Sequence, residues 1–187
     1  MNQAEDKVVE KWNTFFSLTE RLGRPGLSEM ATELGERIAL CPASQNKEYP
    51  GCHPGGLVEL SLSITSKMRA LNKALNLEVD QESLILVGLY HSIGFVGSRT
   101  EPFLVDHTSN WHRDRGIMYD YNQSLPKSPV SHRSLQLLQE FGVRLSFDEW
   151  VSIAVSGGPG RDESKFYTGT EPPLAILLQQ ARQWVNR

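Results

Sequence analysis

One apolar run, Leu84-Ile85-Leu86-Val87-Gly88-Leu89, does most to limit the folds that this chain can adopt. It follows Asp80, a favourable N-cap residue, and is therefore predicted to lie in a helix. A helix that is apolar nearly all round is normally buried at the centre of a domain. His91 and Ser92 lie at its C-terminal end, where Gly94 loosens the backbone. The other elements are therefore expected to pack around this helix.

Apolar residues at helical spacing predict further helices on both sides of this central one. Pro and Gly residues separate these segments, and the span from Pro42 to Gly56 is predicted to be a loop. Ser146 and Glu149 have the spacing of a capping box. The additional helices are expected at about Ala4 to Leu22, Ser28 (as N-cap) to Leu40, Leu57 to Leu77, Ser131 to Phe141, Ser146 (as N-cap) to Val155, and Leu174 to Val185. The pattern predicts an all-α fold of about seven helices.

A long polar connection runs from about Ser98 to Pro129 and is expected to carry a short helix or a hairpin. Connections of this length are uncommon unless they cover a functional site. This one mixes aromatic and basic side chains, namely Trp111, Arg113, Arg115, Tyr119 and Tyr121. Four of them, Trp111, Arg113, Arg115 and Tyr119, combine stacking surfaces with guanidinium groups, which suits a nucleobase and its phosphates.

Length and charge exclude several classes of function. A chain of 187 residues favours one domain, and 39% hydrophobic with 22% charged residues is typical of a soluble globular protein. A net charge of −3 gives no basic footprint, so duplex nucleic acid is not an expected partner. The first residues are polar and acidic, and no apolar run approaches the roughly 20 residues that span a bilayer. With only Cys41 and Cys52, no disulfide framework is implied, and a cytoplasmic location is expected.

Two segments carry a resemblance to a known family. Gly55-Gly56-Leu57-Val58-Glu59-Leu60-Ser61-Leu62 is similar to a helix, roughly GGLLEHSL, of the HD superfamily of metal-dependent phosphohydrolases. Leu89-Tyr90-His91-Ser92-Ile93-Gly94-Phe95 resembles the family's second ligand segment, roughly LLHDIGK. Weaker matches follow in the same order, at Cys41–Ser44, Trp111–Tyr119, Ser131–Leu135 and Glu171–Ala175. The resemblance, closest to small phage-type members, implies an HD-domain-like helical bundle with its core at 42–187 and an N-terminal helical extension at 1–41.

The resemblance also identifies what the chain lacks. Active HD proteins need imidazoles and carboxylates to bind a divalent cation, which polarises a phosphoryl oxygen and lowers the pKa of a bound water. Leu60 stands where the first histidine is expected, and Ser92 where the aspartate is expected. A later His-Asp-Gly aligns best with Ser156-Gly157-Gly158, which leaves His91 as the clear survivor. The resemblance therefore implies no catalytic residue, no metal and no cofactor.

A pocket at this position is expected to keep polar and aromatic side chains that could hold a ligand. His132 and Arg133 lie near a helix start, which suits a phosphate. The residues predicted to contact the ligand are His53, His91, Ser92, Trp111, Arg113, Arg115, Tyr119, His132, Arg133, Ser156, Gly157 and Tyr167.

Each of these patterns also has a purely structural interpretation. His91 at the end of a buried helix fits a hydrogen-bonded core histidine, and the turn after Ser156 fits a helix end as well as an anion nest. The aromatic and basic residues of the long connection also fit a loop that is anchored by its own side chains.

The leading hypothesis is a catalytically inactive HD-fold protein that binds and sequesters a nucleotide-type ligand. Because the nearest look-alikes are phage proteins, one candidate ligand is a cyclic nucleotide or cyclic oligonucleotide that serves as a host immune signal in the host cytoplasm. Two alternatives stay open. One is a nucleotide phosphohydrolase with a rearranged metal site at His53, His91 and His132; the other is a pseudoenzyme that binds a protein partner. Self-association, with a ligand shared across the interface, also stays open.

Overall fold

The computed structural model describes residues 3–185 and is mainly helical, with 61% helix and 4% strand, which confirms the predicted all-α bundle. Its described residues form nine α-helices, seven of which have at least seven residues. In that part of the chain, none of the helices is long and apolar enough to cross a membrane. The elements are α1 (Gln3–Leu22), α2 (Leu27–Leu40), α3 (Gly56–Leu75), α4 (Gln81–Tyr90), η1 (Ile93–Val96), β1 (Leu104–Asp106), α5 (Asn110–Asp114), β2 (Tyr119–Tyr121), α6 (Val130–Glu140), α7 (Phe147–Ala154), η2 (Val155–Gly157), α8 (Asp162–Lys165) and α9 (Pro173–Val185).

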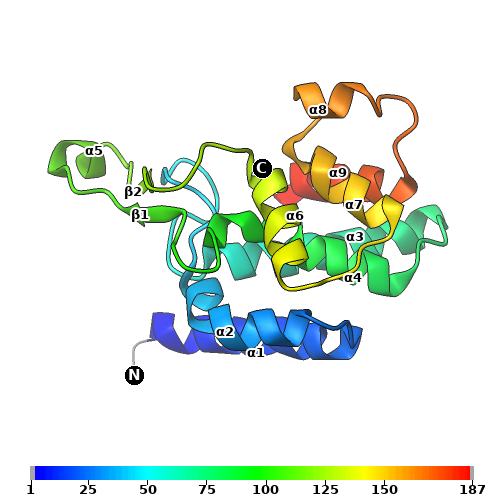
Figure 1. Cartoon of the computed structure of the whole chain (residues 1–187), viewed down its shortest axis with the longest axis horizontal. Coiled ribbons are helices and arrows are strands. Elements are labelled where there is room, and N and C mark those ends of the chain that lie inside the picture. Colours follow the sequence, from blue (N-terminus) through cyan, green and yellow to red (C-terminus); the bar gives the residue numbers. More distant parts are fainter. Residues whose placement is uncertain (1–2, 186–187) are drawn as a thin grey trace.

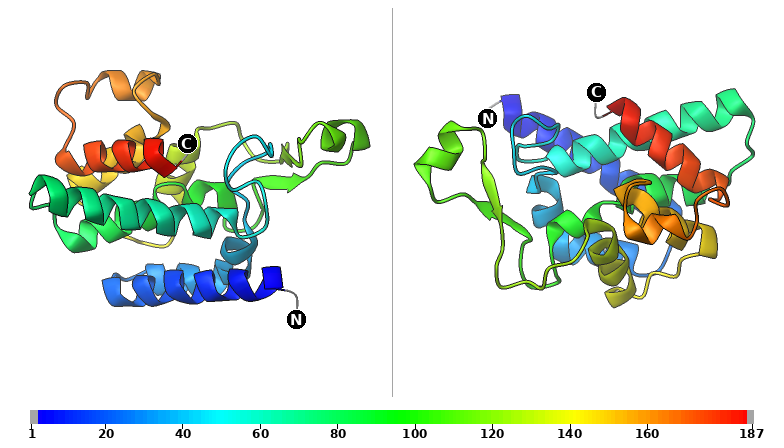
Figure 2. Two further views of the ribbon diagram at one scale, coloured as in Figure 1. Left: turned by 180° about the vertical axis from the view of Figure 1, so that it is seen from behind. Right: turned by 90° about the horizontal axis from the view of Figure 1, so that it is seen from above.

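The long helices lie in layers (Figures 1 and 2). Helices α1 and α2 form one outer layer, α3 and α4 lie in the middle, and α6, α7 and α9 cover the opposite side. As predicted, α4 is central: Leu84, Leu86, Val87, Leu89 and Tyr90 have no exposed side-chain surface. Burial of one such side chain contributes about 1.5–3 kcal/mol to the stability of the fold. The apolar run therefore acts as the centre of the core.

Helices α1 and α2, predicted as an N-terminal extension, contribute to the principal core. Phe15 and Met30 belong to the same buried cluster as the side chains of α4. The Thr19 and Tyr90 hydroxyl oxygens lie 2.7 Å apart in the interior and form a hydrogen bond between α1 and α4. Helices α1 and α2 thus share one hydrophobic interior with α4.

Helix ends agree with the prediction where a side chain caps the helix. They differ from it where a residue in the left-handed conformation begins or ends the helix. Asp80 accepts a hydrogen bond from the Ser83 amide at 2.8 Å, and Ser146 forms the predicted capping box with Glu149. Ser28, however, is not an N-cap: α2 begins at Leu27, and Gly26 precedes it with φ 88°. A side chain at Gly26 would collide with the Phe141 carbonyl, so only glycine fits there.

Other helix boundaries shift by one or two residues. Helix α3 ends at Leu75 instead of Leu77, because Asn76 takes a left-handed conformation, with φ 51°. Helix α6 covers Val130–Glu140, one residue earlier than predicted.

The long polar connection contains both of its predicted alternatives. Strands β1 and β2 form an antiparallel hairpin, with Leu104 opposite Tyr121, and α5 lies at its tip. We call residues 104–121 the arm; it projects from the helical layers (Figure 1). The loop before α3 supports it, because the Met118 amide donates to the Gln45 carbonyl at 2.8 Å.

Candidate functional site

A cavity of about 830 Å³ lies where α4, the base of the arm, α6, the segment after α7 and α9 meet. Ligand pockets commonly have volumes of about 300–1,000 Å³, so the cavity has the size of a small-molecule site. The predicted site residues that line it are His91, Ser92, Arg133, Ser156 and Gly157. These residues come from three separate segments of the sequence, and the fold brings them together.

His91 forms part of the cavity wall at the end of α4 and is only 2% exposed. Its Nδ1 lies 3.1 Å from the Gly88 carbonyl oxygen. A carbonyl can only accept, so Nδ1 carries the ring proton and donates it. Burial, assisted by the positive charge of Arg182, lowers the pKa of His91 to about 3. The ring is therefore neutral, and Nε2 is an acceptor that no group in residues 3–185 satisfies.

Aromatic rings form a second wall of the cavity. Phe103 and Tyr121, on either side of the base of the arm, are stacked with ring centroids 4.8 Å apart. The Arg133 guanidinium lies over the Phe103 ring, 4.3 Å from its centroid. This arrangement presents a flat apolar surface beside a positive charge.

Positive charge exceeds negative charge around the cavity. Three arginines line it, Arg133, Arg161 and Arg182, together with Lys127, whereas Glu163 is the acidic residue of the lining. Removal from water lowers the pKa of both Arg133 and Arg182. Arg182 forms no ion pair or hydrogen bond within the described part of the chain. Arg182 is partly removed from water, and a guanidinium in this state without a protein partner favours an anion beside it.

Further polar atoms of the lining lack a partner. Arg133 is 6% exposed; its Nη2 donates to the Pro126 carbonyl, but its Nε has no hydrogen-bond partner. Ser131 is 3% exposed, and its hydroxyl is also without a partner. Most buried polar groups in proteins are hydrogen-bonded, so such exceptions around one cavity are informative. They are consistent with a site that is complete only when a ligand is present.

A serine fixes the base of the cavity. The Ser134 hydroxyl of α6 lies 3.0 Å from the His91 carbonyl and accepts a hydrogen bond from the Gly94 amide at 2.9 Å. Gly94 packs directly on α6, where a side chain would lie 2.8 Å from the Ser134 nitrogen and closer still to the Val130 carbonyl. The end of α4 and the start of α6 are thereby held together.

The structure does not bring the arm residues of the prediction to this cavity. Trp111 is 58% exposed on α5, and the Arg115 guanidinium stacks on its ring, 3.4 Å from the centroid. Arg113 lies on the same helix, and Tyr119 pairs with Asp106 farther along the hairpin. Helix α5, which carries Trp111 and Arg113, lies at the tip of the projecting arm (Figure 1), and the Tyr119 amide faces the Gln45 carbonyl of the loop before α3 at 3.3 Å. Phe103 and Tyr121, at the base of the arm, line the cavity.

Three other predicted residues also lie outside the cavity lining. His53 is exposed beside Glu59, with Nε2 3.7 Å from the carboxylate oxygen Oε2. His132 is exposed on α6, on the side opposite its buried neighbours. Tyr167 packs against Val151 and Ala175.

The rearranged metal site, with His53, His91 and His132 as ligands, is not formed. Among residues 3–185, no group of three or more His, Cys, Asp or Glu side chains is placed to hold a metal ion. The three histidines cannot share an ion, because His91 is buried, whereas His53 and His132 are exposed on different elements.

Arg182, Arg161, Phe103 and Tyr121 are lining residues that sequence reasoning missed. The position of Arg182 could have been predicted from the sequence. It follows the buried Leu178 by four residues and therefore lies on the same face of α9, where a charged residue is unusual. Phe103 and Tyr121 had no comparable signal, because their position depends on how the arm leaves the body.

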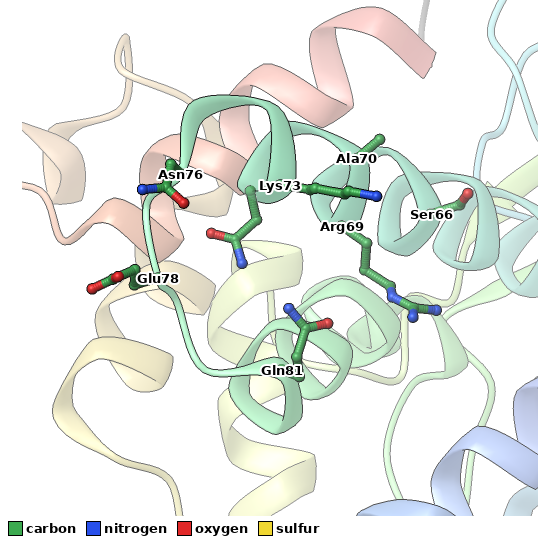
Figure 3. A pocket seen from close by; sticks show the side chains of 8 residues that line it. Ser66, Arg69, Ala70, Lys73, Asn76, Glu78 and Gln81 are labelled. Atoms are coloured by element: carbon green, nitrogen blue, oxygen red, sulfur yellow. The ribbon is translucent and has the colours of Figure 1, made fainter.

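A second hollow, of about 510 Å³, lies between α3 and the start of α4 (Figure 3). Ser66, Arg69 and Lys73 contribute from successive turns of α3, and Gln81 from α4. These side chains are exposed, and the lining contains no aromatic ring. This hollow therefore lacks the enclosed, mixed character of the larger cavity.

We compared the chain with protein-family models, with curated proteins and with solved structures, and none of them matches it. The resemblance to HD proteins therefore stays a prediction, and the function has to be argued from the cavity.

Proposed function

We propose that this protein binds a nucleotide-type ligand in the cavity and holds it without hydrolysing it. One observation carries the proposal: an aromatic wall, Phe103 and Tyr121, lies in the same cavity as Arg182, whose guanidinium no carboxylate of residues 3–185 neutralises. A nucleobase gains about 1–3 kcal/mol from stacking on an aromatic side chain. A phosphate would supply the missing negative charge, and guanidinium groups bind phosphates through parallel hydrogen bonds.

The chemistry of the wall favours binding over turnover. Hydrolysis of a phosphate ester needs an activated water, and a general base works best with a pKa near the operating pH. His91, with a pKa of about 3, is a poor base at neutral pH. Ser92 offers a neutral hydroxyl where the resemblance would place an aspartate. Leu60, at the position of the expected histidine, lies beside Gly51, outside the cavity lining.

Sequestration gives such a pocket a function of its own. A protein that lowers the free concentration of a small signal needs tight binding and slow release instead of catalysis. The resemblance to phage proteins supports cyclic nucleotides or cyclic oligonucleotides of host immunity as the ligand, and the host cytoplasm as the location.

The proposal is tested with metal-free protein and a panel of linear and cyclic nucleotides. Binding is measured by calorimetry, the complex is then denatured, and the released ligand is analysed by chromatography. Stoichiometric recovery of intact ligand is expected. Turnover that depends on added Mn²⁺ or Mg²⁺ contradicts sequestration, and absence of binding across the panel favours the protein-partner alternative.

Arg182→Met and Arg69→Ala form a matched pair for locating the site. Arg182 lines the large cavity, whereas Arg69 is an exposed arginine of the second hollow (Figure 3). Loss of binding in the first variant alone locates the ligand in the large cavity, and loss in the second alone moves it to the hollow.

A further inference from the structure

We infer that the ligand carries a free hydroxyl next to its phosphate, as a ribonucleotide does, and that this hydroxyl donates a hydrogen bond to Nε2 of His91. The inference rests on the proposed nucleotide-binding function and specifies the sugar of the ligand.

The first step is the tautomer of His91. Nδ1 faces the Gly88 carbonyl at 3.1 Å, and a carbonyl accepts hydrogen bonds only. Nδ1 is therefore the protonated nitrogen. The ring is buried, has the Arg182 guanidinium as its charged neighbour, and forms no ion pair with an acid. It is consequently uncharged, and Nε2 offers a lone pair.

Residues 3–185 supply no donor to this lone pair. Ser92, Ser156 and Arg182 also line the cavity, yet no hydrogen bond joins any of them to Nε2 within the described residues. A ligand that displaces solvent from His91 must supply a donor in its place, because an acceptor that loses its donor costs about 1–3 kcal/mol.

The third step is that a phosphate cannot be this donor. Ionised phosphate oxygens only accept, so a phosphate directly against Nε2 would place two acceptors face to face. Arg182 has the opposite requirement, because its guanidinium only donates. The two groups line the same cavity, and the Arg182 charge lowers the pKa of His91. A ligand that satisfies both needs an anionic group and a hydrogen-bond donor side by side.

Ribose phosphates have this pairing. In a 3′,5′-cyclic mononucleotide or a 3′–5′-linked cyclic dinucleotide, the 2′-hydroxyl is on the carbon next to the phosphate-bearing 3′ carbon. A 2′-deoxy sugar keeps the base and the phosphate and lacks this hydroxyl. The same chemistry distinguishes RNA from DNA at many protein sites.

The first experiment compares 3′,5′-cyclic AMP and cyclic GMP with their 2′-deoxy and 2′-O-methyl counterparts by calorimetry, in the presence of a chelator. Affinity about tenfold tighter for the ribose forms is expected, the size of one hydrogen bond to a buried neutral acceptor. Equal affinity for ribose and deoxyribose forms overturns the inference and leaves nucleotide binding intact. Failure of the whole panel, extended to cyclic dinucleotides, overturns both.

Two His91 variants provide the matched control. His91→Asn keeps an amide near the Nδ1 position, to donate to Gly88, and removes the acceptor at Nε2. His91→Gln places an amide oxygen near the Nε2 position. The ribose preference should fall to about one in His91→Asn and persist in His91→Gln; a preference that survives in His91→Asn contradicts the assignment.

A spectroscopic readout applies even if these variants do not fold. In wild-type protein with ¹⁵N-labelled histidine, the Nε2 resonance of His91 should shift on addition of a ribose nucleotide and remain in place with the deoxy form. An unchanged resonance with both ligands overturns the inference.

Discussion

Arg24, in the turn between α1 and α2, holds Glu149 of α7 by two hydrogen bonds, from Nη1 to Oε2 at 2.8 Å and from Nη2 to Oε1 at 2.6 Å. Glu149 has no exposed side-chain surface, whereas Arg24 is 22% exposed. The pair connects the N-terminal layer to the far side of the bundle. Burial tends to raise the pKa of Glu149, but hydrogen bonds from Arg24 and from the Ser146 amide lower it by more.

Arg24→Ala should destabilise the protein by about 3 kcal/mol, because it leaves a buried carboxylate without its counter-charge. Urea unfolding followed by circular dichroism measures the effect. Arg21→Ala, one turn earlier on an exposed site, is the control and should change stability by less than about 0.5 kcal/mol. An equal effect of the two substitutions would show that the ion pair adds nothing beyond an ordinary surface arginine.

His91 should make the protein less stable in acid. Its folded pKa is about 3, below the ordinary value of 6.5, so between these values the unfolded chain binds the extra proton. Stability should therefore fall as the pH decreases from 6.5 toward 3, by at most about 1.4 kcal/mol per pH unit from this group. His91→Asn should flatten this part of the profile in urea titrations at successive pH values. A profile identical to wild type would mean that other groups cause the loss.

Gly94→Ala should weaken the junction below the cavity. The added methyl group would lie 2.8 Å from the Ser134 nitrogen, in rigid backbone that cannot yield cheaply. We expect a loss of about 1–3 kcal/mol, measured by thermal unfolding. Gly160→Ala is the matched control, because nothing lies within 4 Å of a side chain at that position. Similar melting temperatures for the two variants would contradict the tight contact.

Arg182→Met should separate stability from binding. Removing an unpaired, desolvated guanidinium should leave the free protein equally stable or up to about 1 kcal/mol more stable. The same change should reduce nucleotide affinity at least tenfold, since the phosphate loses its main partner. Parallel unfolding and calorimetric titrations check both effects. A destabilised variant with unchanged affinity would assign Arg182 to the structure instead of the ligand.

The aromatic wall yields the last prediction. Tyr121→Ala should weaken binding by about tenfold for purine and pyrimidine ligands alike, because stacking depends little on the base. Trp111→Ala, on the projecting α5, should have no effect on affinity. If Trp111→Ala weakened binding and Tyr121→Ala did not, the ligand would lie on the arm, as the sequence alone had suggested.

Local pattern was enough to predict most helices of this fold. The apolar run of α4 and the caps at Asp80 and Ser146 were correct, because each depends on residues close in sequence. The end of α3 was wrong, because the left-handed conformation of Asn76 is a backbone choice that apolar spacing does not report. The same limit explains why the N-cap of α2 is Gly26 and not the predicted Ser28.

The candidate site was predictable to a smaller extent. His91, Arg133 and Ser156 lie at helix ends that a bundle brings together, so their grouping could be anticipated. The direction of the arm could not be anticipated, because it depends on hydrogen bonds between distant segments, such as that of the Met118 amide with the Gln45 carbonyl. The aromatic residue that lines the cavity is therefore Tyr121, and not the predicted Trp111.

The contacts of the Ser134 hydroxyl with the His91 carbonyl and the Gly94 amide also affect how a ligand can exchange. Because the Ser134 hydroxyl connects the end of α4 to α6, we expect these two helices to stay together when a ligand enters. We expect a ligand to enter and leave between the base of the arm and the segment that carries Arg161 and Glu163, which also line the cavity. Association and dissociation rates should therefore respond to changes in these peripheral segments. The equilibrium constant should be governed mainly by the floor and by Arg182, so retention time and affinity could be altered independently.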